Sequence, residues 1–184
     1  MILSPATARV FSLLWQERRL AGYISKAELR RAIEETFGTE VKPGERKQVE
    51  ADLIILGAGP AGLSAAIYAG RAKLNAVVVE EGLPGGQAAT TYHIANYPGT
   101  PGVIRGRELM DNMLRQAQSF GVRVDDYKEV AEVDLVGEVK KVVTEDTDYY
   151  ALALIIATGA KPRLLPAEGE DTFRGRGVHY CATC

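Results

Sequence analysis

The stretch Asp52-Leu-Ile-Ile-Leu-Gly57-Ala-Gly59-Pro-Ala-Gly62 joins a short apolar run to a cluster of glycines. The run from Leu53 to Leu56 has the length of a strand that is buried on both faces in a parallel sheet. The glycines follow the G-x-G-x-x-G spacing of a strand-to-helix turn that carries a pyrophosphate. A helix expected at Ala61 to Lys73 directs its free backbone N–H groups and positive dipole end at such an anion. The stretch therefore predicts a dinucleotide-binding turn.

An acidic residue follows the second strand expected in this unit. That strand covers Asn75 to Val79, and Glu80 comes directly after it. A carboxylate at this place can accept a hydrogen bond from a ribose hydroxyl. A glycine-rich turn of an unrelated α/β protein could show the same glycine spacing. The order of strand, turn, helix and acidic residue favours the nucleotide site.

Length and composition are those of an ordinary globular protein. The 184 residues suffice for one medium domain, alone or with a small appendage. A formal net charge of -2 gives no reason to expect nucleic acid or an anionic membrane as a partner. No apolar run reaches membrane-spanning length and no secretory signal is recognisable, so we expect a cytoplasmic protein.

Residues 1–48 read as a separate helical extension. Apolar residues at helical spacing around Trp15 give one helix an apolar face. The capping-box spacing Ser25-Lys-Ala-Glu28 begins a second helix, which Gly38 ends. We interpret the pair as a small helical hairpin used for packing or docking. Residues 39–50 are charged, contain Pro-Gly and lack periodicity, which is typical of a linker.

The rest of the chain alternates helix and strand signals. Gly82 to Gln87 is too rich in glycine for a helix or strand, and an irregular loop continues to Pro101. An amphipathic helix is expected at Arg107 to Phe120, followed by a short strand at Val122 to Val124. Three strands joined by short turns come next, at residues 127–136, 139–144 and 149–156. We predict an α/β fold, with a parallel sheet around the glycine turn and an antiparallel three-stranded meander.

Both cysteines, Cys181 and Cys184, lie at the end of the sequence. In a reducing compartment such a pair is more often redox-active or metal-binding than structural. A zinc site needs four ligands, and only His93 and His179 are available beside the pair, so we expect no metal. Two cysteines at this spacing can close a small disulfide ring, and exchange then requires an exposed thiolate.

Four further motifs follow the glycine turn in a fixed order: Gly85-Gly86-Gln87, Asn96-Tyr-Pro-Gly99, Ala153-Leu-Ile-Ile-Ala157-Thr158-Gly159-Ala160 and Cys181-Ala-Thr-Cys184. With the turn, they make residues 51–184 resemble the thioredoxin reductases of the low-molecular-weight, bacterial type, members of the pyridine nucleotide-disulfide oxidoreductases. The resemblance implies that residues 49–160 are the first part of a Rossmann-like FAD-binding domain. Residues 1–48 would precede it, and residues 161–184 would be the hinge and the start of an NADPH-binding domain.

The resemblance also implies roles for individual residues. The glycine turn would bind the pyrophosphate of FAD, and Val130 would meet the adenine through its backbone. Gln87 and Asn96 would hydrogen-bond near the isoalloxazine ring and the ribityl chain. Without the resemblance, Asn96 would be interpreted as a turn-forming residue before Tyr-Pro. The implied cofactor-binding residues are Gly57, Ala58, Gly59, Pro60, Ala61, Gly62, Glu80, Glu81, Gly85, Gly86, Gln87, Asn96, Val130, Ala157, Thr158 and Gly159.

In the family, electrons pass from NADPH to FAD, then to a redox disulfide, and finally to a protein disulfide such as that of thioredoxin. By resemblance, Cys184 faces the flavin and Cys181 attacks the partner. The family continues beyond this pair with an acidic residue, an NADPH-binding domain and a return segment. We therefore expect this polypeptide alone not to catalyse NADPH-dependent reduction, and the intact enzyme to be a homodimer.

Two alternatives remain open. Related flavoproteins with a Cys-x-x-Cys reduce glutaredoxin-like or peroxidase partners, although residues 1–48 carry no cysteine that could relay electrons. The other alternative is a non-catalytic flavin-binding or docking module that uses the helical hairpin as its surface.

Overall fold

A computed structural model divides the chain into two units, Met1–Glu45 and Arg46–Cys184. The structure describes Arg31, Glu34, Gly38 and residues 45–161, 163–174 and 176–180. The expected helical hairpin therefore lies outside the described residues, apart from its end. Gly38 has φ +60°, and its N–H donates to the Glu34 carbonyl at 2.9 Å. This is the geometry of a glycine that ends a helix.

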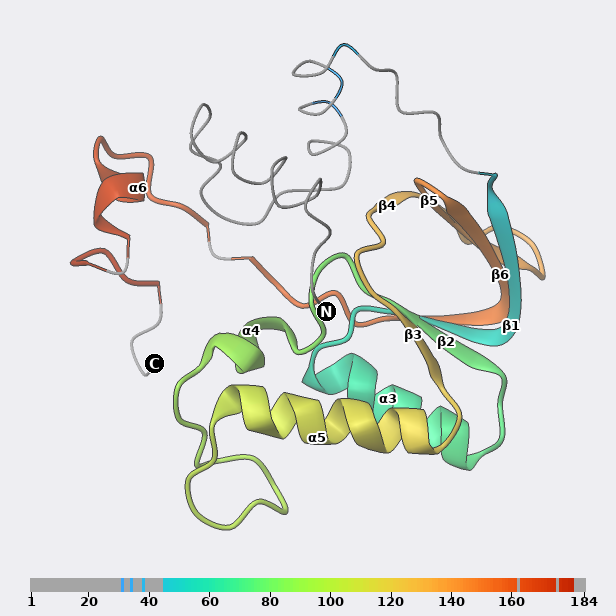
Figure 1. The fold of residues 1–184 in the computed structure, drawn as a ribbon, viewed down its shortest axis with the longest axis horizontal. Coiled ribbons are helices and arrows are strands. Elements are labelled where there is room, and N and C mark those ends of the chain that lie inside the picture. Colours follow the sequence, from blue (N-terminus) through green and yellow to red (C-terminus); the bar gives the residue numbers. More distant parts are fainter. Residues whose placement is uncertain are drawn as a thin grey trace. The chain divides into compact units, whose positions relative to one another are not determined.

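In the described part of the chain, six strands form one sheet (Figure 1). The strands are β1 Lys47–Leu56, β2 Ala76–Val79, β3 Arg123–Asp125, β4 Val130–Asp134, β5 Lys140–Thr144 and β6 Thr147–Ile156. In the order β3-β2-β1-β6-β5-β4, the first four strands pair in parallel, and β6, β5 and β4 pair antiparallel. The predicted α/β fold, with a parallel βαβ unit and a three-stranded meander, is confirmed.

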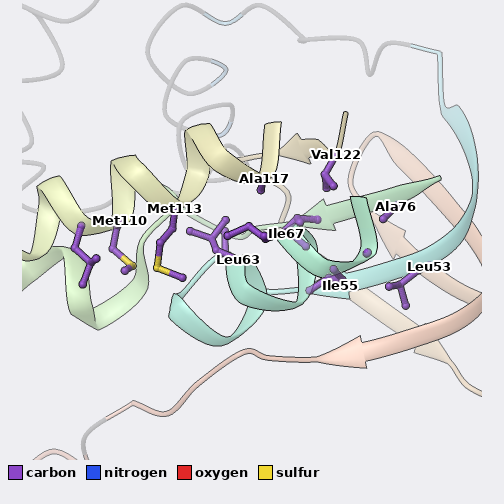
Figure 2. Packing of buried hydrophobic residues seen from close by; sticks show 14 residues of the cluster. Leu53, Ile55, Leu63, Ile67, Ala76, Met110, Met113, Ala117 and Val122 are labelled. Atoms are coloured by element: carbon purple, nitrogen blue, oxygen red, sulfur yellow. The ribbon is translucent and has the colours of Figure 1, made fainter. Parts of the chain in front are cut away.

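Four helices are described: α3 Pro60–Arg71, α4 Gly86–Thr90, α5 Gly106–Ser119 and α6 Glu170–Phe173. Figure 2 shows Leu63 and Ile67 of α3 lying beside Met110 and Met113 of α5 in one buried cluster. In α5 the buried residues recur at helical spacing, so that one stripe of the helix faces the core. Among the described helices, none has the length and apolar character needed to cross a membrane.

The second half of the central strand β1, Leu53 to Leu56, is buried on both of its faces. Leu53 and Ile55 pack in the cluster that contains α3 and α5, whereas Ile54 and Leu56 pack in a second cluster that contains Tyr149. These four strand residues are at most 7% exposed. Successive strand residues point to opposite faces. Both faces are covered, which explains why the strand is a continuous apolar run rather than an alternating one.

The strand β1 begins at Lys47, inside the segment predicted to be a linker. Residues 47–51 pair in parallel with residues 147–151 of β6. The Lys47 N–H also donates to the Asp146 carbonyl at 2.9 Å. The linker prediction was therefore wrong for residues 47–50. Their charged composition suits a half-exposed strand, and pairing with a distant part of the chain overrides the local pattern.

A single helical turn, α4, begins in the loop where the sequence predicted neither helix nor strand. The Ala89 N–H donates to the Gly85 carbonyl at 3.2 Å. The hydroxyls of Thr90 and Thr91 donate to the Gln87 carbonyl at 2.8 and 3.2 Å. Gly85 has φ +124°, a conformation that glycine adopts readily. The glycines therefore turn the chain just before α4 and do not prevent the helix from forming.

Charged side chains fasten the start of β1 to the β5–β6 hairpin. Arg46 forms an ion pair with Asp148, and the other carboxylate oxygen of Asp148 lies 3.3 Å from the Lys141 Nζ. The hydrogen bond from Arg46, supported by one from Lys141, holds the pKa of Asp148 below its usual range. The ionised form of this carboxylate therefore stabilises the junction of the three strands.

Replacing Asp148 by Asn should lower the free energy of unfolding at pH 7. A carboxylate whose pKa is lowered by folding contributes stability above its unfolded-state pKa, about 3.9, and loses it as the pH falls through the folded-state value. Urea unfolding should therefore show a difference between wild type and Asp148→Asn that shrinks below about pH 4. Asp126→Asn, at an exposed carboxylate, is the control. An equal loss of unfolding free energy in Asp126→Asn would contradict the stabilising role assigned to the Asp148 carboxylate.

Candidate functional site

The chain turns sharply from β1 into α3 at Gly57. This residue has φ +100°, and its N–H donates to the Val79 carbonyl at 2.8 Å. A Cβ at this position would lie 2.4 Å from the Ala157 carbonyl oxygen. Only glycine therefore fits where the ends of β1, β2 and β6 meet.

The other two glycines of the turn have different tasks. A Cβ at Gly62 would lie 1.8 Å from the Gly57 carbonyl oxygen, so glycine here lets α3 pack directly on the turn. A Cβ at Gly59 would meet nothing within 4 Å. Its φ of −75° is open to other residues as well. Contacts within the described chain give no reason for a glycine at this position, so the open space fits a ligand that approaches the backbone.

The helix α3 begins at this open space. Gly59 is its N-cap residue and Pro60 its first residue. Among the described residues no side chain caps this end, and its first turn holds no acidic residue. The first N–H groups of a helix lack partners within the helix and carry partial positive charge. The ligand that suits this position is an anion such as a phosphate.

Glu80 fastens the glycine turn to the loop after β2. One carboxylate oxygen accepts from the Ala58 N–H at 2.6 Å, and the other accepts from the Gly82 N–H at 2.9 Å. The backbone of Glu80 is also held. Its N–H donates to the Asp125 carbonyl at 2.9 Å, and its carbonyl accepts from the Lys128 N–H at 2.8 Å. The carboxylate predicted to meet a ribose therefore lies directly at the turn.

Asp125, whose carbonyl accepts from the Glu80 N–H, is itself held by a buried tyrosine. Tyr149 of β6 is fully buried, and its hydroxyl donates to Asp125 Oδ2 at 2.8 Å. Burial raises the pKa of Tyr149, so the hydroxyl keeps its proton and remains a donor. The other oxygen of Asp125 accepts from the Arg123 Nε at 2.7 Å. The network links β3 to β6 beneath the candidate site.

The second glycine cluster packs against the first. The Gly85 N–H donates to the Ala58 carbonyl at 2.8 Å. A Cβ at Gly86 would lie 3.3 Å from the Gly59 Cα, and Gly86 has φ +55°. The loops after β1 and β2 therefore lie against each other at the start of α3.

A cavity of about 460 Å³ lies beside the turn. Five of the predicted cofactor-binding residues line it: Gly57, Glu80, Glu81, Val130 and Thr158. Apolar side chains of Val133, Leu135 and Ile156 form another part of the wall. Such a wall suits a flat, uncharged base, and carboxylates suit sugar hydroxyls but repel a phosphate. The cavity therefore fits a nucleoside better than a phosphorylated sugar.

Gln87 and Glu81 connect the loop after β2 to the segment after β6. The side-chain amide of Gln87 donates to the Ala160 carbonyl, and the Lys161 Nζ lies 3.9 Å from Glu81. Gln87 is not part of the cavity wall. The predicted residues on these two segments are therefore gathered at one edge of the sheet.

One of the predicted residues, Asn96, does not line the cavity, and two others lie outside the described residues. Asn96 is exposed in the loop between α4 and α5 and does not line the cavity. Cys181 and Cys184 lie outside the described residues. Of the predicted residues that the structure describes, those of the glycine turn and of the loop after β2 lie close together, whereas Asn96 is not part of the cavity wall.

Sequence reasoning missed several residues of the cavity wall. They are Leu56, Val79, Glu129, Val133, Leu135 and Ile156. Three of them end parallel strands, and ligands of such sheets bind at the carboxyl ends of the strands, so this rule could have found them. The three residues on or beside β4 carried no comparable signal.

Residues 51–184 match the family model described as pyridine nucleotide-disulphide oxidoreductase. The match covers well over half of the chain, and the protein belongs to this family. The family assignment agrees with the observed glycine turn and with the order of the strands.

Individual relatives carry more specific names. The chain is 48% identical over 139 residues to the 34.2 kDa protein in the rubredoxin operon of Clostridium pasteurianum, covering 76% of this chain and 45% of that protein. It is 47% identical over 133 residues to a thioredoxin reductase of Listeria monocytogenes, covering 72% and 41%. The crystal structure of thioredoxin reductase from Streptococcus pyogenes aligns with a TM-score of 0.64 and 44% identity, covering 74% and 44%. The chain spans less than half the length of these relatives.

The variants Gly62→Ala and Gly59→Ala should differ in stability. The new methyl group at position 62 would overlap a backbone oxygen, and overpacking of this kind costs about 1–3 kcal/mol or more. At position 59 it would enter open space, so we expect only the smaller cost of an alanine in place of a glycine N-cap, about 0.5–1 kcal/mol. Urea unfolding measures both. Equal destabilisation would show that the space at Gly59 is not open.

Proposed function

We propose that this protein provides the flavin-binding part of an FAD-dependent disulfide reductase that acts on thioredoxin or a similar dithiol protein. The observation that carries the proposal is the open space before Gly59 at the start of α3, beside Glu80 and the cavity. A pyrophosphate joined to an adenosine suits both features at once. The substrate class is that of the related proteins named thioredoxin reductase.

Different groups of the chain would hold different portions of FAD. Backbone N–H groups at the start of α3 would bind the pyrophosphate, and Val130 with its apolar neighbours would enclose the adenine. Gln87, Asn96 and residues 157–159 would contact the flavin portion. When bound, FAD supplies the redox chemistry that connects a hydride donor, here NADPH, to a disulfide. Residues 161–184 would begin the part that binds NADPH, and the intact enzyme would be a cytoplasmic homodimer.

Glu80 can bind a ribose without releasing the turn. Its carboxylate already accepts from the Ala58 and Gly82 N–H groups. An ionised carboxylate has about four lone-pair sites, so it retains capacity for sugar hydroxyls. The same oxygens would then hold both the protein loop and the ligand.

The two cysteines would perform thiol–disulfide exchange. The Cys181 thiolate attacks the disulfide of the partner, which forms a mixed disulfide and releases one partner thiol after it takes up a proton. The Cys184 thiolate then attacks the Cys181 sulfur, which closes the Cys181–Cys184 disulfide and releases the second partner thiol. The roles of the two cysteines are those implied by the resemblance.

FAD binding tests the proposed cofactor site. Wild-type protein should bind FAD more tightly than FMN, because FMN lacks the adenosine for which the cavity is proposed. Gly59→Ala should weaken FAD binding about tenfold or more, since its methyl group occupies the space proposed for the pyrophosphate. Flavin fluorescence titration measures both affinities. Tyr68→Phe, at an exposed position on the same helix, should bind like wild type. Unchanged affinity in Gly59→Ala would contradict the site.

Trapping of a mixed disulfide tests the acceptor. Cys184→Ser removes the thiol that resolves the mixed disulfide, so reduced Cys184→Ser incubated with oxidised thioredoxin should form a covalent complex. Cys181→Ser is the matched control and should form far less of it. Non-reducing electrophoresis and mass spectrometry detect the linkage. Capture of a glutaredoxin-like or peroxidase protein, but not of thioredoxin, would show that the captured protein is the acceptor and would contradict the proposal of thioredoxin. Flavin binding without any trapped partner would favour a non-catalytic flavin-binding module.

A further inference from the structure

Lys128 joins two segments of the cavity wall that come from different parts of the chain. Its backbone N–H donates to the Glu80 carbonyl at 2.8 Å. Residues 80–81 line the cavity on one segment, and residues 129–130, which follow Lys128 in the sequence, line it on the other. The distance between the two segments therefore depends on where the backbone of Lys128 lies.

The side chain of Lys128 is held as well. Its Nζ donates to both carboxylate oxygens of Asp146, at 2.6 and 2.7 Å. The side chain of Lys128 is only 14% exposed, whereas that of Asp146 is 42% exposed. A largely buried ammonium requires a partner, and a hydrogen bond between charged groups is about twice as strong as one between neutral groups. The ion pair therefore holds Lys128 against the turn between β5 and β6.

The turn that carries Asp146 is itself closed by hydrogen bonds. The Asp146 carbonyl accepts from the Lys47 N–H at 2.9 Å, and Asp146 Oδ1 accepts from the Thr147 hydroxyl at 3.0 Å. The Thr144 hydroxyl donates to the Thr147 carbonyl at 2.9 Å and accepts from the Thr147 N–H at 3.2 Å. Both threonines are 1% exposed. Because buried polar bonds restrain this turn, Asp146 gives Lys128 a fixed point of attachment.

The backbone just before Lys128 is constrained too. Tyr127 has φ +52°, in the left-handed region that a tyrosine rarely adopts. Its N–H donates to the Gly82 carbonyl at 3.3 Å. A conformation of this kind persists only where the surrounding structure imposes it. We interpret the strained backbone at Tyr127 as a consequence of placing Lys128 between Glu80 and Asp146.

We propose that Lys128 is a positioning residue for the adenosine portion of a bound dinucleotide. Its backbone sets the distance between residues 80–81 and residues 129–130, and its ion pair with Asp146 keeps that backbone in place. Lys128 is not part of the cavity wall, so it acts through the wall and not by contact with the ligand. The inference rests on the proposed function, since the cavity is the one assigned to adenosine.

Ligand titration of the full chain tests this role. Lys128→Met keeps the aliphatic stem and removes the ammonium, and Asp146→Asn removes the negative charge. Each variant should raise the dissociation constant of FAD about three- to tenfold, the effect of losing about one hydrogen bond. ADP, which carries adenosine without a flavin and is measured by displacement of FAD, should weaken by the same factor. FMN, which lacks the adenosine, should bind as it does to wild type.

Lys141→Met is the matched control. Lys141 also forms an ion pair with an aspartate of the β5–β6 hairpin, Asp148, at 3.3 Å, and it does not line the cavity. Its replacement should leave the constants of all three ligands unchanged. An effect on FAD as large as that of Lys128→Met would overturn the inference, because loss of any ion pair in the hairpin would then suffice.

A double variant separates the ion pair from other effects of each substitution. If the two residues act as a pair, Lys128→Met combined with Asp146→Asn should bind FAD no more weakly than the weaker single variant. Losses that multiply in the double variant would overturn the inference. An unchanged constant for FAD or ADP, with or without a lowered melting temperature, would overturn it as well. In these cases wild type still prefers FAD to FMN. A wild-type chain without that preference would overturn the proposed adenosine site together with the inference.

Discussion

The close contact between the start of α3 and the end of β1 is the constraint on which the site depends. Gly62 lies so near the Gly57 carbonyl that no side chain fits between them. This contact places the helix N-terminus where the ends of β1, β2 and β6 come together. Glu80 then joins the turn to the next loop through two backbone N–H groups. A single close approach of two backbone segments thus organises loops that are far apart in the sequence.

The features that could be predicted from the sequence are those that depend on local requirements. The glycine spacing is fixed by backbone approach, and the apolar run of β1 is fixed by burial on both faces. The first half of β1 could not be predicted, because residues 47–50 are stabilised by pairing with β6 and by Arg46 on Asp148. The turn of α4 was missed for a similar reason, since Gly85 gains its positive φ from the packing of two loops.

In the candidate site, too, some residues could be predicted from the sequence and others could not. Residues within the glycine turn and directly after the strands, such as Glu80 and Thr158, were predicted, whereas the last strand residues Leu56, Val79 and Ile156 were not, although topology places the carboxyl ends of parallel strands together. Residues of β4 that line the cavity were not predicted, since their position follows from antiparallel pairing across β5. The resemblance added Asn96, which is exposed in its loop and does not line the cavity. The family resemblance therefore proposes a role for a residue that motif spacing and periodicity do not single out.

The position of β4 has a consequence for how such a protein can change over generations. In the described chain β4 is one of the two edge strands of the sheet, and its residues 131–134 are exposed. Val133 and Leu135 form part of the cavity wall but belong to neither buried cluster. Substitutions there can reshape the cavity wall while the backbone turn and both cores stay intact. If the cavity binds a base as proposed, preference for that base can therefore change at the margin of the sheet while the glycine turn stays unchanged.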